Sequence, residues 1–154
     1  MPQTGKVVWI GVRPKSREAV VPVRSVLVSK EKGLEGDHYA GKPGSKRQVT
    51  LIQEEHLSTV ASILKVGSID PTLTRRNIVV SGINLIALKN QLFKVGKVIL
   101  QGTGDCAPCS RMEANLGEGG WNAMRGHGGI TANVVAGGEI SVEDKVVLIA
   151  DQDE

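Results

Sequence analysis

The chain has 154 residues, a formal net charge of +3 and two cysteines. This length predicts one domain, which we place at residues 5–150, followed by a disordered tail at 151–154. No apolar run reaches the roughly 20 residues of a membrane helix, and the first residues lack a signal-peptide layout, so we expect a cytoplasmic protein without a membrane partner. The basic residues stand in short groups beside glycines, which argues against a nucleic-acid partner and favours a small anionic ligand.

Short apolar runs separated by turn residues follow one another along the chain. Apolar residues make up 40% of it but aromatic residues only 3%, so the core must be built from Val, Ile, Leu and Ala, and the many valines favour strands. The runs are 7–12, 19–28, 48–52, 77–80, 98–100, 130–135 and 145–149. Their spacing predicts a mainly β fold, a barrel or a sandwich, with a hairpin at 136–139 and a tight turn at 94–97.

Two helices are expected among these strands. The first covers about 53–64, where four apolar residues share one face and two glutamates occupy the first turn. The second is short and begins at Ser110-Arg111-Met112-Glu113, which matches a capping box. In that motif Ser110 accepts from the backbone N–H of Glu113, and the Glu113 side chain reaches back. Cys109 would then lie immediately before a helix N-terminus.

The position of Cys109 favours chemistry at its sulfur, because the helix dipole and the neighbouring Arg111 both stabilise a thiolate. The ordinary alternative is a buried cysteine that packs as a small apolar residue. A structural zinc site would need ligands beyond the Cys106–Cys109 pair, and the chain offers only three isolated histidines, namely His38, His56 and His127. A thioredoxin-like dithiol would need a βαβ context that the pattern lacks. A lone thiolate at Cys109, a metal ligand or a sulfur carrier, is the simplest functional interpretation.

Three glycine-punctuated groups carry most of the remaining polar chemistry. They are Gly36-Asp37-His38 with the later Lys46 and Arg47; Arg75-Arg76-Asn77; and Arg125-Gly126-His127-Gly128. Each alone is compatible with a solvated loop or strand end. Together they would offer guanidinium groups and backbone N–H groups to an anion. Trp121, close to the third group, could cover a heterocycle or simply pack in the core.

Taken in order, these motifs resemble the MOSC domain, which is found at the C-terminus of molybdenum cofactor sulfurases and as stand-alone bacterial proteins. The resemblance rests on Gly33-x-x-Gly36-Asp37-His38, the strand at Arg47, Arg76-Asn77-Ile78 and above all Pro108-Cys109, and continues from 106 to 130. It implies a β-barrel similar to the barrel domain of pyruvate kinase, with a few short helices and with Cys109 as the key residue. One departure is the segment Val142-Glu143-Asp144, where the family commonly has Gly-Asp before the last strand.

The resemblance also implies a function and a set of roles. The cofactor would be the pterin-type molybdenum cofactor, with Cys109 as metal ligand or sulfur carrier and with Asp37, His38 and His127 handling protons. The cofactor would be held by Arg47, Arg76, Asn77, Arg125, Gly126 and Gly128. We expect a reductase of N-hydroxylated small molecules; the alternatives are a carrier of persulfide sulfur and a plain anion-binding domain. No pyridoxal-phosphate domain or ferredoxin domain is recognisable in the chain, so the electron or sulfur donor would be another protein.

Overall fold

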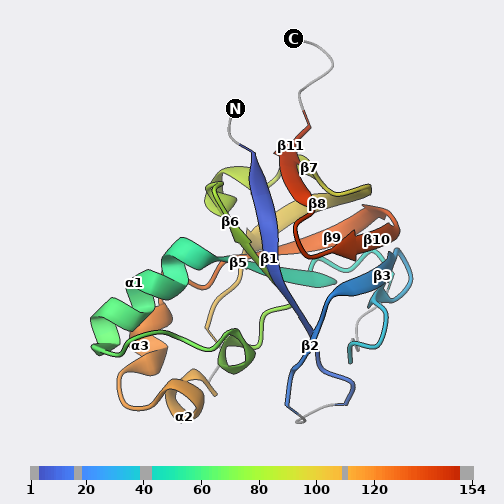
Figure 1. Ribbon diagram of the computed structural model, residues 1–154. Coiled ribbons are helices and arrows are strands. Elements are labelled where there is room, and N and C mark those ends of the chain that lie inside the picture. The colour runs from blue at the N-terminus through green and yellow to red at the C-terminus, as the bar shows by residue number, and fades with distance from the viewer. Residues whose placement is uncertain (1–3, 16–18, 39–42, 109–110, 150–154) are drawn as a thin grey trace.

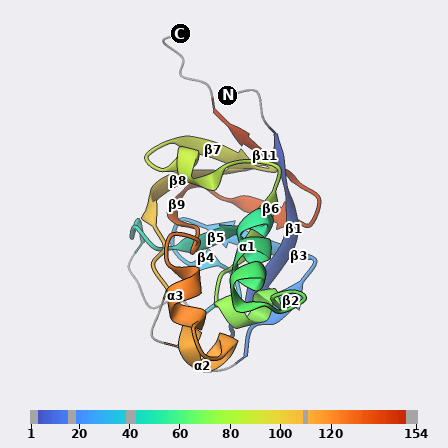
Figure 2. The same cartoon turned by 90° about the vertical axis from the view of Figure 1, so that its left-hand side faces the viewer.

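A computed structural model describes residues 4–15, 19–38, 43–108 and 111–149. Cys109, Ser110 and the tail expected at 151–154 lie outside the described residues. Within the described part, strands predominate, and three short α-helices lie together at one side of them in both ribbon views (Figures 1 and 2). This is the mainly β architecture predicted from the spacing of the apolar runs.

Seven strands close into a barrel. Their order is β1 (Gly5–Val12), β6 (Ile78–Ser81), β5 (Val49–Gln53), β9 (Ile130–Ala136), β8 (Val98–Asp105), β7 (Leu92–Val95) and β11 (Lys145–Leu148), and β11 pairs with β1 to complete the circle. All neighbours are antiparallel except β5 and β6. A parallel pair needs a crossover connection, and helix α1 (Glu54–Leu64) lies in the connection between these two strands.

The barrel interior is filled by aliphatic side chains. Residues alternate between buried and exposed along β7 and more loosely along β8, because successive side chains point to opposite faces of the sheet. The inward set is dominated by valine, leucine and isoleucine, with Phe93 as its aromatic member among the described residues. The sequence-based expectation of an aliphatic core is therefore met.

A second apolar layer lies between the barrel wall and the helices. Ile52 of β5 and Val79 of β6 point outward, and they pack with Leu57 and Val60 of α1. Helices α2 (Met112–Leu116) and α3 (Gly120–Met124) add Met112, Ala123 and Met124 to the same layer. Because helices cover its outer face, all five residues of β5 are buried, as expected for a strand covered on both sides.

A three-stranded sheet adjoins the barrel and corrects one prediction. Strand β10 (Gly138–Ser141) follows β9 after a single residue, as in a hairpin, but it pairs with β3 (Ser25–Ser29), which in turn pairs with β4 (Gly33–Leu34). The hairpin expected at 136–139 is therefore wrong. The backbone of Gly137, between β9 and β10, passes so close to the Val28 carbonyl that any side chain there would collide with it.

Other expected elements are largely confirmed. The predicted run 19–28 divides into β2 (Val21–Val23) and β3, and the turn at 94–97 joins β7 to β8. The helix expected at 53–64 is α1. Two 3-10 turns, η1 (Pro71–Thr74) and η2 (Leu85–Leu88), were not predicted. No helix in the described ranges is both long enough and apolar enough to cross a membrane.

Candidate functional site

The segment that leads to Cys109 lies against the glycine-rich loop that precedes β9. Strand β8 ends at Asp105, and the backbone N–H of Cys106 then donates to the Gly129 carbonyl at 2.9 Å. This bond extends the β8–β9 ladder by one step beyond Asp105 and Ile130. Two of the predicted motifs, the cysteine run and the loop at 125–129, are thus brought together by strand pairing.

Arg76 fixes this junction from inside the protein. Its side chain is 1% exposed, and its Nε donates to the Gly128 carbonyl at 2.7 Å. One terminal nitrogen, Nη2, donates to the carbonyls of Cys106 at 3.2 Å and Ala107 at 3.1 Å, and the other donates to Thr74. We expected Arg76 to hold an anion; these four bonds instead go to backbone carbonyls, where the guanidinium joins the start of β6 to the cysteine run and the loop.

The close approach of these backbones explains two glycines of the loop. A Cβ on Gly128 would collide with the Cys106 carbonyl, and one on Gly129 would collide with the carbonyl of Leu51. Gly129 also has φ = +85°, a conformation that glycine adopts without strain. Gly126 has φ = +79° but open space where a Cβ would stand. The glycines at 128 and 129 are thus required by packing, and the one at 126 by backbone conformation.

A cavity of about 510 Å³ opens beside this junction. Its walls come from η2 and the following residue, the end of β8 with the cysteine run, helix α3, and the glycine loop. The lining residues are Ile86, Lys89, Asp105, Cys106, Ala107, Pro108, Trp121, Arg125, Gly126, Gly128 and Gly129. The volume is within the range of small-molecule sites. Pro108, the residue before Cys109 in the sequence, is part of the wall.

Of the charged side chains in the cavity wall, two form an ion pair with each other and one contacts an aromatic ring. Lys89 pairs with Asp105 at 3.1 Å, so these two charges largely neutralise each other. Arg125 lies 5.3 Å from the centre of the Trp121 ring, a cation–π arrangement on helix α3. No carboxylate in the described ranges forms an ion pair with Arg125. The wall therefore has a positive charge beside an aromatic surface. Trp121 is 41% exposed, so it does not pack in the core.

Glu113 holds the two short helices together. Its carboxylate accepts from the backbone N–H of Gly119 at 2.9 Å and of Trp121 at 3.0 Å, and these bonds lower the pKa of Glu113. We predicted that the same side chain would reach back to Ser110 in a capping box. In the described residues the two oxygens of Glu113 bind the start of α3, so the bond of the capping motif to Ser110 stays a prediction. Ser110 lies outside the described residues.

His127 stands in the glycine loop behind the cavity. Its Nδ1 lies 3.0 Å from the Ala123 carbonyl, and its ring makes an edge contact with His56 of α1 at 5.4 Å between centres. The pKa of His56 is lowered, first by burial and then by the charge that His127 can carry. His127 is not among the described residues of the cavity lining.

The remaining predicted residues lie elsewhere. Asn77 accepts from the Thr50 N–H and hydroxyl and donates to Gly11, so it binds β5 to β1. Asp37 accepts from the backbone N–H of Arg13 at 2.7 Å.

His38 and Arg47, two further residues that the sequence predicted for the site, are exposed. Neither of them, nor Asp37 or Asn77, is among the described residues that line the cavity. Of the residues predicted to hold the cofactor, Arg125, Gly126 and Gly128 line one cavity, with Arg76 behind them.

Several residues at the cavity were missed by sequence reasoning. Lys89 and Asp105 are 16 residues apart in the sequence and in no motif, and the pairing of β7 with β8 and the bridge between Lys89 and Gly102 bring them together. Arg125 and Trp121 were both singled out from the sequence, but their contact with each other was not, because helix α3 was not predicted. Arg13 was also missed; its Nη1 is buried without a hydrogen-bond partner in the described structure.

Comparison with known proteins identifies the family. The family model described as the MOSC domain matches residues 36–147, about three quarters of the chain. The chain belongs to the MOSC domain family. None of the curated proteins matches it.

Solved structures share the fold of this MOSC chain. The YuaD protein from Bacillus subtilis is similar with a TM-score of 0.81 and 18% identity, over 97% of each chain. YiiM from Geobacillus stearothermophilus is similar with a TM-score of 0.76 and 18% identity, over 95% of this chain and 75% of YiiM. YiiM from Escherichia coli is similar with a TM-score of 0.70 and 18% identity, over 95% of this chain and 70% of that one. The expected MOSC barrel is thereby confirmed.

Proposed function

We propose that the 510 Å³ cavity binds the molybdenum cofactor, and that the protein reduces N-hydroxylated small molecules. MOSC membership, which is generally tied to molybdenum cofactor binding, provides the starting point. The observation that carries the proposal is the position of Pro108 in the cavity wall, because the next residue is the cysteine to which the family resemblance assigns the chemistry.

The residues present fit such a cofactor better than a bare metal ion. No group of three or more His, Cys, Asp or Glu side chains in the described ranges is arranged to hold a metal. A metal that arrives with its own sulfur ligands on a pterin needs only one protein thiolate, and a soft metal suits a thiolate. The phosphate of the pterin needs a cation, and Arg125 supplies an unpaired one at the wall.

The roles of the other residues follow from their contacts. Arg76 fixes the carbonyls of Cys106 and Ala107, and so orients the run that ends at Cys109. Trp121 and Arg125 form one wall of the cavity. Lys89 also lines the cavity and forms an ion pair with Asp105, the last residue of β8. When bound, the cofactor supplies two electrons, which an electron-donor protein replaces. Reduction of R–NHOH takes up two electrons and two protons, breaks the N–O bond and releases R–NH₂ and water.

Metal analysis of protein from a host that makes the cofactor tests the proposal. We expect about one molybdenum per chain in the wild type. Cys109→Ser should lose the metal, whereas the matched variant Cys106→Ser should retain it. A reduced viologen should then support conversion of an aromatic amidoxime to the amidine by the wild type but not by Cys109→Ser.

Two results would contradict the proposal. A wild type without molybdenum that carries a persulfide mass on Cys109 would favour the sulfur carrier instead. Retention of both metal and activity in Cys109→Ser would remove that cysteine from the chemistry.

A further inference from the structure

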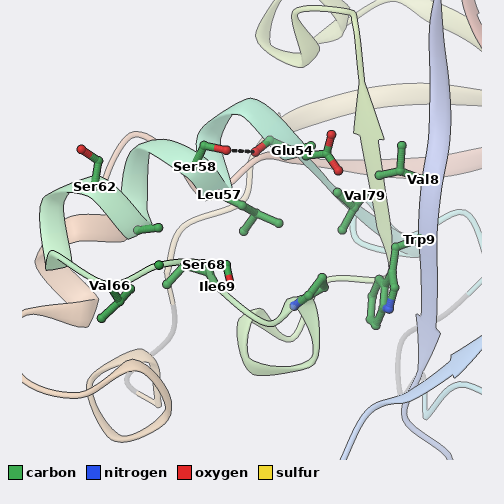
Figure 3. A pocket seen from close by; sticks show the side chains of 13 residues that line it. Val8, Trp9, Glu54, Leu57, Ser58, Ser62, Val66, Ser68, Ile69 and Val79 are labelled. Carbon is green, nitrogen blue, oxygen red and sulfur yellow. Dashed lines mark hydrogen bonds between the residues drawn. The ribbon is translucent and has the colours of Figure 1, made fainter.

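A second and larger cavity lies on the outer wall of the barrel. Its volume is about 680 Å³, and it is enclosed by strands β1 and β6, helix α1 and the segment 66–71 (Figure 3). The described residues that line this outer cavity and those that line the cavity beside Cys106 have no member in common. The two are therefore separate sites, and the proposed function makes no use of this one.

Most of the lining of the outer cavity is apolar. Val8 and Trp9 of β1, Val79 of β6 and Leu57 of α1 form one side, and the apolar residues of 66–71 form the other. The indole of Trp9 lies over Gly11, because a Cβ on Gly11 would collide with its outer edge. The ring thus offers an aromatic surface to a ligand in the outer cavity.

One charged side chain occurs among the described residues of the lining. Glu54 is the first residue of α1, and its carboxylate points away from the helix toward Val8 and Val79 (Figure 3). The Ser58 hydroxyl donates to the backbone carbonyl of Glu54 and not to its carboxylate. No described residue donates a hydrogen bond to that carboxylate, whereas the next residue, Glu55, is bound to Gly82 and Gln53.

An apolar pocket with one unpaired carboxylate and one aromatic ring selects a particular class of ligand. The carboxylate attracts a cation, the indole ring interacts favourably with an ammonium group, and the aliphatic wall buries an apolar body. An anion would meet Glu54 without a compensating positive charge in the described lining. We propose that the outer cavity binds a small organic cation with an apolar body, such as an arylalkylammonium ion.

Tryptophan fluorescence provides the test, because the chain has two tryptophans. In a Trp121→Phe background, Trp9 is the remaining tryptophan, and with excitation selective for tryptophan over Tyr39 it reports on the outer cavity. The probes are 2-phenylethylammonium, the neutral 2-phenylethanol and the anionic 3-phenylpropionate, which share one ring and differ in charge. We expect a saturable change in Trp9 emission with the ammonium probe, weaker binding of the alcohol, and no binding of the carboxylate.

Variants then test the part played by the carboxylate. Glu54→Gln should weaken binding of the ammonium probe about fivefold while changing that of the alcohol little, as expected for a partly exposed ion pair. Glu139→Gln, which neutralises an exposed carboxylate on β10, should leave both unchanged. The proposal is overturned if the ammonium probe gives no saturable change up to about 10 mM. It is equally overturned if all three probes bind alike, or if Glu54→Gln binds the ammonium probe as the parent does.

Discussion

Replacement of Arg76 by Met removes the guanidinium while keeping a long apolar side chain. Four hydrogen bonds to the carbonyls of Thr74, Cys106, Ala107 and Gly128 are lost. A buried acceptor left without its partner costs about 1–3 kcal/mol, which would give about 4–12 kcal/mol for four independent carbonyls. Water entering from the adjacent cavity can satisfy some of them, so we expect a loss of about 3–5 kcal/mol in the free energy of unfolding.

Urea denaturation measures this loss, and hydrogen exchange locates it. The amide of Cys106, bonded to the Gly129 carbonyl, should exchange faster in Arg76→Met, together with its neighbours in 104–107. Arg125→Met is the matched control: this exposed arginine contacts the Trp121 ring, so its loss should cost about 1 kcal/mol or less. A loss below about 1 kcal/mol in Arg76→Met, with unchanged exchange at 104–107, would refute the anchoring role of Arg76.

Three further predictions follow from backbone conformation and titration. Gly129→Ala should destabilise the protein by more than about 2 kcal/mol, because its Cβ would collide with the Leu51 carbonyl. Gly126→Ala, whose Cβ would stand in open space, should cost only the roughly 1–2 kcal/mol of a residue in the left-handed conformation. Equal melting temperatures of the two variants would contradict this. Glu143 has φ = +82°, a conformation that favours glycine, and its ion pair with Lys6 is exposed and contributes little. Glu143→Gly should therefore raise the stability by about 0.5 kcal/mol after the entropy of the freer unfolded chain is counted, and a lower melting temperature would contradict this. The pKa of His56 in the folded state is below 6.5, so the stability that it contributes is complete above pH 6.5 and is lost as the pH falls below that value. Between about pH 8 and about pH 5, the melting temperature of His56→Gln should therefore fall less than that of the wild type. Parallel curves of melting temperature against pH would contradict this.

The barrel was predictable because its signals are local. Apolar runs bounded by turn residues mark the strands, and the amphipathic pattern at 53–64 marks α1. The partner of each strand is a long-range property, which is why β10 was assigned to a hairpin with β9 although it pairs with β3. The closure of β1 on β11 is likewise set by the whole sheet and by no single segment.

The candidate site was predictable in its location but less so in its contacts. The glycines beside Arg125 were expected to offer their backbone to an anion, which stays a prediction; Gly126 and Gly128 line the cavity, and Gly128 and Gly129 lie where two backbones approach closely. Arg76 carried the same sequence signal as an anion-binding arginine, yet burial turns its guanidinium toward backbone carbonyls. The capping motif did not indicate the bonds from Glu113 to two N–H groups at the start of α3, because the sequence did not indicate that helix.

The most direct test of the account is the amount of cofactor held after the charge at the cavity wall is reversed. Molybdenum and pterin should be measured together in protein from one cofactor-producing host, for Arg125→Glu and for Lys94→Glu, which reverses an exposed charge on β7 away from the cavity lining. We predict that Arg125→Glu lowers the content of both by roughly tenfold or more, and that Lys94→Glu retains the wild-type content. Equal occupancy in Arg125→Glu and Lys94→Glu would contradict the claim that this cavity holds the cofactor.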